Sequence, residues 1–283
     1  MINNRTLRRR KNGVSLIGKI GRNFKKFHFF TKRQKFVIGV LILSFGLFFS
    51  EHFFGRSGLI FVFLLSLLTD LLILLSIYED IKETDSLYVF ILPFLFSFAF
   101  GLFYFLVPAR FITRIAITSL YGIGLYSLLL SQNIFVIASM KTIQLLPSAR
   151  IVSFILTVVS YFFLANIAFS LHLSIIPLSL IIFSFSFLLV FHSLWMYGLD
   201  KSARQLAIWS LALAGCLFEA SLILWFWPTN PTVIALFLTG FYYSIVGLTH
   251  VWFDKRLFKN VLWEYVWVGA IVLFVLILFT SWG

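Results

Sequence analysis

Long runs of apolar residues, separated by short polar stretches, fill the chain from about Phe36 to Trp282. A helix rises about 1.5 Å per residue, so roughly 17 to 25 apolar residues are needed to cross a hydrocarbon core of about 30 Å. Nine runs meet this length. We predict spans at 36–54, 58–78, 87–107, 112–131, 151–170, 174–196, 205–227, 232–251 and 261–282. The pattern therefore predicts an all-α integral membrane protein, a bundle of about nine transmembrane helices.

Composition agrees with this pattern. Hydrophobic residues make up 61% of the 283 residues and charged residues only 12%, whereas soluble domains carry about 25% charged residues. The apolar runs leave no segment long enough for a water-soluble domain with its own core. We therefore divide the chain into a basic cytoplasmic tail, residues 1–35, and a single polytopic transmembrane domain, residues 36–283.

Basic residues are distributed unevenly between the two predicted sides of the membrane. The tail contains twelve Lys or Arg, and the loops on the same side contain eight, whereas the opposite side has only Arg56, Arg110 and Arg114. Short cytoplasmic loops are enriched in Lys and Arg. We therefore predict a multi-pass protein of the cytoplasmic membrane with its N-terminus inside and its C-terminus outside.

The tail contains a basic amphipathic segment at residues 16–30. Its apolar residues recur at helical spacing and its basic residues lie elsewhere; the apolar set is Ile17, Ile20, Phe24 and Phe27, and the basic set is Lys19, Arg22, Lys25 and Lys26. Such a helix is suited to lie on the inner leaflet and bind anionic lipids through the basic set. Nucleic-acid binding is the alternative for a patch of this charge. It is disfavoured because an orientation signal beside the first span explains the charge without a partner.

Two acidic residues lie deep inside predicted spans, more than one helical turn from either end. Asp70 lies about 18 Å into the second span, where a carboxylate costs about 2.5 to 3.5 kcal/mol unless it is paired, protonated or hydrated. Ser66, one turn earlier, is a candidate donor to Asp70. We interpret Asp70 either as a proton or cation site or as a hydrogen-bonding group between helices.

Glu219 lies in the seventh span, on a face of small residues with Ala212, Gly215, Cys216 and Ala220. Small residues allow a neighbouring helix to approach closely. We therefore expect Glu219 to point into the bundle, at a depth similar to that of Asp70. We expect Cys216 to be a small buried side chain, because a lone cysteine forms neither an intrachain disulfide nor a thiolate metal site.

Polar groups also gather near the predicted membrane surfaces. His192, His250, Asp254 and Glu264 are candidates for an acid–base site at the inner face, and satisfied interfacial histidines are the alternative. Their spacing matches no metal-binding motif, so we predict no metal and no cofactor. On the outer side Arg110 and Arg114, four residues apart, are candidates for binding a lipid headgroup or for simple snorkelling anchors.

Two interruptions of the apolar pattern are informative. Pro93, inside the third span, predicts a kink. Residues 133–150, NIFVIASMKTIQLLPSAR, are too polar for a span and predict an interfacial or re-entrant segment or an extension of the fourth helix. Here Asn-Ile-Phe followed by Lys-Thr-Ile-Gln-Leu-Leu resembles a stretch in an uncharacterised family of small bacterial multi-pass membrane proteins. That family has no assigned activity, so the resemblance implies a bacterial inner-membrane location and nothing about chemistry.

Three functional classes fit this sequence. An accessory or scaffold protein would use its helix surfaces and basic tail to hold membrane-protein partners. A transporter or flippase of a small or lipidic solute would use Asp70 and Glu219 in one pathway. An enzyme acting on lipid-linked substrates would use His192 and His250 in a pocket open to the cytoplasm. The absence of a recognisable catalytic motif or internal repeat favours the accessory class; catalytic residues are not identified.

Overall fold

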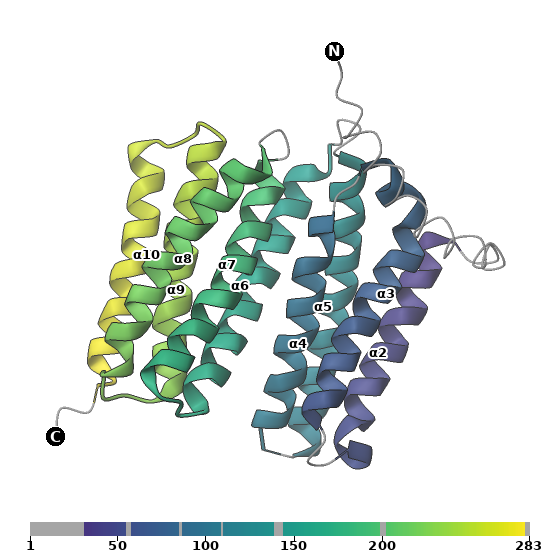
Figure 1. Cartoon of the computed structure of the whole chain (residues 1–283), viewed down its shortest axis with the longest axis horizontal. Coiled ribbons are helices and arrows are strands. Elements are labelled where there is room, and N and C mark those ends of the chain that lie inside the picture. The colour runs from purple at the N-terminus through teal and green to yellow at the C-terminus, as the bar shows by residue number, and fades with distance from the viewer. Residues whose placement is uncertain are drawn as a thin grey trace, which may run out of the picture.

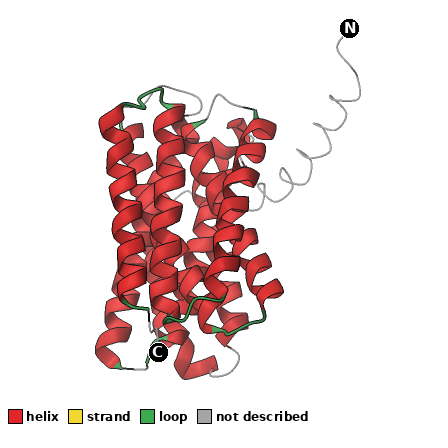
Figure 2. Cartoon of the chain, turned by 90° about the vertical axis from the view of Figure 1, so that its left-hand side faces the viewer, coloured by secondary structure: helices red, strands yellow, loops and turns green. Residues whose placement is uncertain are grey.

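The computed structural model describes residues 31–54, 58–84, 87–108, 110–138, 144–198 and 202–280. These residues contain nine α-helices and one short 3₁₀-helix, and no strand is present among them (Figures 1 and 2). The helices are α2 Lys32–Phe54, α3 Gly58–Thr84, η3 Leu87–Phe90, α4 Ile91–Leu106, α5 Phe111–Ala138, α6 Leu146–Ser170, α7 Ile175–Tyr197, α8 Ala203–Trp225, α9 Pro231–Phe253 and α10 Lys259–Leu278. Within these ranges, nine segments are long and apolar enough to cross a membrane, which confirms the predicted fold class.

The helix ends refine two predictions. The fourth predicted span continues as α5 to Ala138, so the start of 133–150 is an extension of this helix, while residues 139–143 lie outside the described part. The sequence predicts a kink at Pro93, and the structure divides this span into η3 and α4. Pro93 lies in the first turn of α4, directly after η3, where a missing N–H leaves no helical hydrogen bond unmade.

The helices form two groups that lie side by side (Figure 1). In the first group α2 packs on α3 and α5, and α3 packs on α4; in the second, α6 packs on α7 and α9, α7 on α8, and α9 on α10. Contacts of α4 and α5 with α6, and of α4 with α7, join the groups. The predicted amphipathic segment 16–30 lies outside the described residues.

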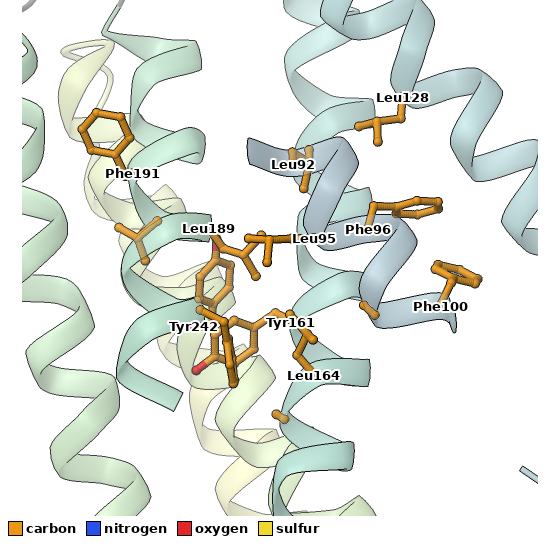
Figure 3. Close-up of a cluster of buried hydrophobic side chains, with 14 of the residues drawn as sticks. Leu92, Leu95, Phe96, Phe100, Leu128, Tyr161, Leu164, Leu189, Phe191 and Tyr242 are labelled. Carbon is orange, nitrogen blue, oxygen red and sulfur yellow. The ribbon is translucent and has the colours of Figure 1, made fainter. Parts of the chain in front are cut away.

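Large side chains fill the space between the two groups. Leu95 of α4 extends toward Leu189 of α7, beside the stacked rings of Tyr161 and Tyr242 (Figure 3). These two tyrosine rings lie 4.3 Å apart, centre to centre, and both residues are fully buried. Because the contact surface is formed by interlocking leucine and aromatic side chains, the two groups make one continuous core.

α10 is attached to the edge of the bundle through α9. Gly240 and Gly247 of α9 face α10 so closely that an added Cβ at Gly240 would lie 2.5 Å from Val272, and one at Gly247 would clash with the Tyr265 ring. Ser244, between the two glycines, donates a hydrogen bond to the Tyr265 carbonyl at 3.3 Å. The small residues of α9 therefore form a packing surface for α10.

The bundle has two chemically different ends. α2 begins at one end and α10 terminates at the other (Figure 1), as an odd number of crossings requires. Arg150 and Arg204 lie where α6 and α8 begin, at the end where α2 begins, whereas Arg110 and Arg114 lie at the opposite end, where α5 begins. We call these the predicted cytoplasmic and outer ends; the orientation itself stays a prediction.

Candidate functional site

A compact polar cluster lies at the predicted cytoplasmic end, between α6, α7 and α9. The His250 ring of α9 is only 3% exposed, and its Nε2 lies 3.0 Å from the Ser193 hydroxyl oxygen of α7. Tyr197 stacks on the same ring at 3.9 Å and 12°, and Phe154 meets it edge-on at 4.9 Å. Ser193, Tyr197 and Phe154 therefore enclose much of the His250 side chain.

Arg150 of α6 closes this cluster. Its guanidinium carbon lies 4.8 Å from the centre of the Tyr197 ring, and its Nε donates a hydrogen bond of 3.0 Å to the Met196 carbonyl at the end of α7. A terminal nitrogen lies 3.8 Å from the Asp254 carboxylate, which follows α9. Arg150, Tyr197 and His250 thus form a layered stack that joins three helices at their ends.

His192 belongs to a different contact. Its ring is fully buried, and Nε2 lies 3.3 Å from the side-chain nitrogen and 3.5 Å from the side-chain oxygen of Gln132 on α5. His192 therefore joins α7 to the first helical group, whereas the neighbouring Ser193 faces His250. The predicted single inner-face site is consequently divided between two contacts, and Glu264, exposed on α10, joins neither.

The two histidine rings at the predicted cytoplasmic end are both buried by the described residues. Both histidines are at most 3% exposed, so a substrate in solution has no access to either ring. Within the described ranges, no three His, Cys, Asp or Glu side chains are arranged to hold a metal ion. The cluster is therefore built to hold helix ends together.

A row of buried hydroxyl groups links three helices of the first helical group. The Thr69 and Ser97 hydroxyl oxygens lie 2.8 Å apart, and Ser97 lies 3.1 Å from the Tyr121 hydroxyl, which joins α3, α4 and α5. Asp70, next to Thr69, is half-buried, and its Oδ1 has no hydrogen-bond partner among the described residues. The predicted donor Ser66 instead donates to the Val62 carbonyl at 2.9 Å.

Glu219 does not point into the bundle, which corrects the sequence-based expectation. It is exposed on α8, as are Ala212 and Cys216, and a Cβ built at Gly215 would meet nothing within 4 Å. The buried face of α8 is a different one, formed by Leu206, Ser210, Ala214, Leu217, Ser221 and Leu224. Glu219 makes no hydrogen bond or ion pair with any residue that the structure describes.

Asp70 and Glu219 are not neighbours. α3 belongs to the first helical group and α8 to the second, where α8 packs on α7 and α9 (Figure 1). The predicted pathway shared by the two carboxyls is therefore wrong. At the outer end, Arg110 is exposed and Arg114 is half-buried at the start of α5; the tail residues Lys19, Arg22, Lys25 and Lys26 lie outside the described ranges.

Several contact residues were not singled out from the sequence. Gln132 lies between the predicted fourth span, which ends at 131, and the segment 133–150. Tyr121, Leu125, Leu128 and Gln132 nevertheless continue one helical face at spacings of four, three and four. Extending the period by one turn would have placed Gln132 in the core. Arg150 gave no comparable signal, because a basic residue at a span end is expected for orientation alone.

Comparison with known proteins identifies a family without an activity. The family model described as "Protein of unknown function (DUF5656)" matches residues 33–279, so the chain belongs to the DUF5656 family. No curated protein and no solved structure matches the chain. The match covers the nine described helices nearly end to end. It agrees with the resemblance of the stretch in 133–150 to an uncharacterised family.

Proposed function

We propose that this member of the DUF5656 family is an accessory or scaffold protein of the cytoplasmic membrane that binds a partner transmembrane helix on the outward face of α8. The observation that carries the proposal is Glu219, a carboxyl within an apolar span that is exposed and without a partner in the described chain. Six residues separate it from the end of α8 at Trp225, which corresponds to a depth of about 9 Å.

A carboxyl at that depth is unfavourable against lipid. Insertion costs about 2.5 to 3.5 kcal/mol for an acidic residue at the centre of a span, less nearer the interface, and intramembrane acids characteristically face protein or water rather than acyl chains. A partner helix that donates a hydrogen bond to Glu219 removes this cost. The partner we infer therefore carries a Ser, Thr, Asn, Gln, Lys or Arg side chain at the same depth.

The surroundings of Glu219 fit a closely approaching helix. Ala212, Gly215 and Cys216 lie on the same face and present only small side chains. Transmembrane helices associate through van der Waals packing where small residues let their backbones come close. The face thus combines a surface for close packing with one polar group that fixes the register of the partner.

Transport by Asp70 is the second candidate, supported by its buried Oδ1 without a hydrogen-bond partner among the described residues. This carboxyl lies next to the Thr69–Ser97–Tyr121 chain, which offers hydroxyl groups but no second titratable carboxyl in contact with it. An enzyme that uses the two histidines is disfavoured because both rings are enclosed. The accessory function therefore accounts best for the polar groups of the bundle.

The test is quantitative co-purification from membranes in a mild detergent. Tagged wild-type chain, Glu219→Leu and the control Leu120→Ala, exposed on α5 in the other helical group, are compared by mass spectrometry. One interhelical hydrogen bond contributes about 0.6 to 1.7 kcal/mol in membranes, so recovery of the partner should fall about 3- to 20-fold in Glu219→Leu and stay unchanged in the control. Equal recovery of every membrane protein with Glu219→Leu would contradict the proposal.

A further inference from the structure

A groove lies between α2 and α3, which pack side by side in the first helical group (Figure 1). Its volume is about 350 Å³, within the range of about 300 to 1,000 Å³ that is typical of small-molecule sites. The two helices meet closely at Gly39 of α2, where an added Cβ would overlap the Leu72 side chain. The missing side chain thus lets α3 approach and forms part of the groove floor.

The groove is apolar along most of its length. Every lining residue but three is Ile or Leu, and Ile42 of α2 and Leu71 of α3 are exposed on its two sides. The lining residues on α3 extend from Leu68 to Ser76, which is about 12 Å along the helix. One leaflet has a hydrocarbon depth of about 15 Å, half of the core. The groove is therefore nearly as long as one leaflet is deep.

The two polar lining residues, Lys35 and Ser76, stand together at the predicted cytoplasmic end of the groove. Lys35 precedes Gly39 by four residues, and Ser76 follows Leu72 by four residues. Because α2 and α3 cross the bundle in opposite directions (Figure 1), the close contact of Gly39 with Leu72 places Lys35 opposite Ser76. The groove thus has a cationic mouth near the membrane surface and an apolar interior.

The Lys35 side chain belongs to the groove itself. It is half-buried, whereas residues 31–34 before it are exposed, and it lines the groove together with the apolar side chains. Its ammonium group makes no hydrogen bond or ion pair with another side chain that the structure describes. A lysine in this position lays its methylene groups along the apolar surface and keeps its charge at the interface. A matching occupant carries an anionic group above an apolar chain.

We propose that the α2–α3 groove binds a phospholipid of the leaflet at the predicted cytoplasmic end, with one acyl chain between the helices and the phosphate on Lys35. The apolar walls take the chain through close contact. The ammonium donates charge-assisted hydrogen bonds to the phosphate oxygens, and these are stronger than neutral ones. Residues 1–30 of the chain carry nine Lys or Arg and no acid, so the tail does not match this cationic mouth.

The phosphate contact is tested by native mass spectrometry on the full chain. The protein is purified in detergent and equilibrated with an equal mixture of phosphatidylglycerol and diacylglycerol that have the same acyl chains. Wild type should retain phosphatidylglycerol preferentially. Lys35→Met, which keeps an unbranched apolar stem, should lower that preference about fivefold, whereas Lys35→Arg should keep most of it.

The control is Lys259→Met, because Lys259 is exposed where α10 begins, at the same predicted end of the bundle. It should leave the lipid ratio unchanged. Thermal melts identify any variant whose fold is lost. An unchanged ratio in folded Lys35→Met, or an equal fall in Lys259→Met, would overturn the assignment of the phosphate to Lys35.

The groove is tested separately by filling it. Leu71→Trp places a larger side chain between the helices and should lower retention of both lipids without changing their ratio. The matched control is Ile60→Trp, exposed on the same helix but outside the groove, and it should retain both lipids as wild type does. Retention in folded Leu71→Trp equal to that of wild type would overturn the groove as the lipid site.

The occupant is identified by a benzophenone amino acid at position 42, which lines the groove and is exposed. After illumination of membranes, the chain should gain the mass of one phospholipid. A cross-link to a peptide from residues 1–30, or an adduct with another protein chain, would overturn the proposal. Because α2 and α3 belong to the other helical group than α8, either outcome leaves the test of the α8 face unaffected.

Discussion

At the scale of single residues, Arg150 makes the most contacts that join helix ends at the predicted cytoplasmic end. It combines a charged hydrogen bond to the Met196 carbonyl with a cation–π contact to Tyr197, which contribute about 1.5 to 3 and 0.5 to 1 kcal/mol respectively. Its ion pair with Asp254 is 3.8 Å long and partly exposed, and such pairs contribute little.

We therefore predict that Arg150→Met destabilises the protein by about 2 to 4 kcal/mol, whereas Asp254→Asn costs less than about 1 kcal/mol. Thermal unfolding in detergent, followed by loss of monodisperse protein, measures both. A larger loss in Asp254→Asn than in Arg150→Met would show that the ion pair, not the stack, holds this end together.

Asp70 separates the accessory function from transport. Asp70→Asn keeps the shape of the side chain, and Oδ1 has no hydrogen bond to lose among the described residues. We expect the variant to express and melt like the parent and to support growth equally across pH. A variant that melts normally but loses pH-dependent uptake or growth support would favour a proton-coupled transporter instead.

The residues of the candidate site were only partly predictable from the sequence. The intramembrane acids and histidines could be located, because ionisable side chains stand out in an apolar background. Which face of α8 carries the core could not, because lipid tails are as apolar as Leu and hydropathy does not distinguish a lipid-facing side from a buried one. Small residues at Ala212 and Gly215 permit a close neighbour but do not say whether it belongs to the same chain.

At the scale of elements, two glycines in similar helices have opposite roles. Gly247 of α9 is covered by the Tyr265 ring of α10, whereas Gly215 of α8 has nothing within 4 Å of a Cβ. We predict that Gly247→Leu displaces α10 and destabilises the bundle by about 1 to 3 kcal/mol, as overpacking does. Gly215→Leu should leave the stability of the purified chain unchanged and reduce recovery of the partner.

Thermal melts measure the stability of these two variants, and co-purification measures their recovery of the partner. Displacement of α10 can be followed separately by maleimide labelling of Ser244→Cys in the Cys216→Ser background. Ser244 lies on the face of α9 that packs against α10. Destabilisation by Gly215→Leu equal to that by Gly247→Leu would mean that the outward face of α8 is packed within the chain.

The helices themselves were predictable because crossing a bilayer fixes their length. Each predicted span corresponds to one helix, with end shifts that follow local chemistry: α5 continues past 131 through polar residues that find core partners, such as Gln132. The effect of Pro93 depends on its place within a helix, and the 3₁₀ turn before it puts Pro93 in the first turn of α4.

At the scale of the whole molecule, the basic bias predicts the N-terminus inside and the C-terminus outside. Nine crossings place the two ends of the bundle on opposite sides (Figure 1). Two crossings, α9 and α10, separate the turn 228–231 from the C-terminus, so both positions should lie on the same side. Reporter fusions at Gly283 and in this turn should therefore both report the outer side. A cytoplasmic signal from the Gly283 fusion would contradict this topology.

The outward face of α8 is tested most directly by photo-crosslinking in native membranes. A benzophenone amino acid at position 216, one turn from Glu219, should form a discrete adduct with one membrane protein, and the same probe at Leu120, exposed on α5 in the other helical group, should react mainly with lipid. Introducing Glu219→Leu should reduce the adduct from position 216 by about 3- to 20-fold. If position 216 reacts only with lipid, as position 120 does, α8 has no partner helix and the proposed function is wrong.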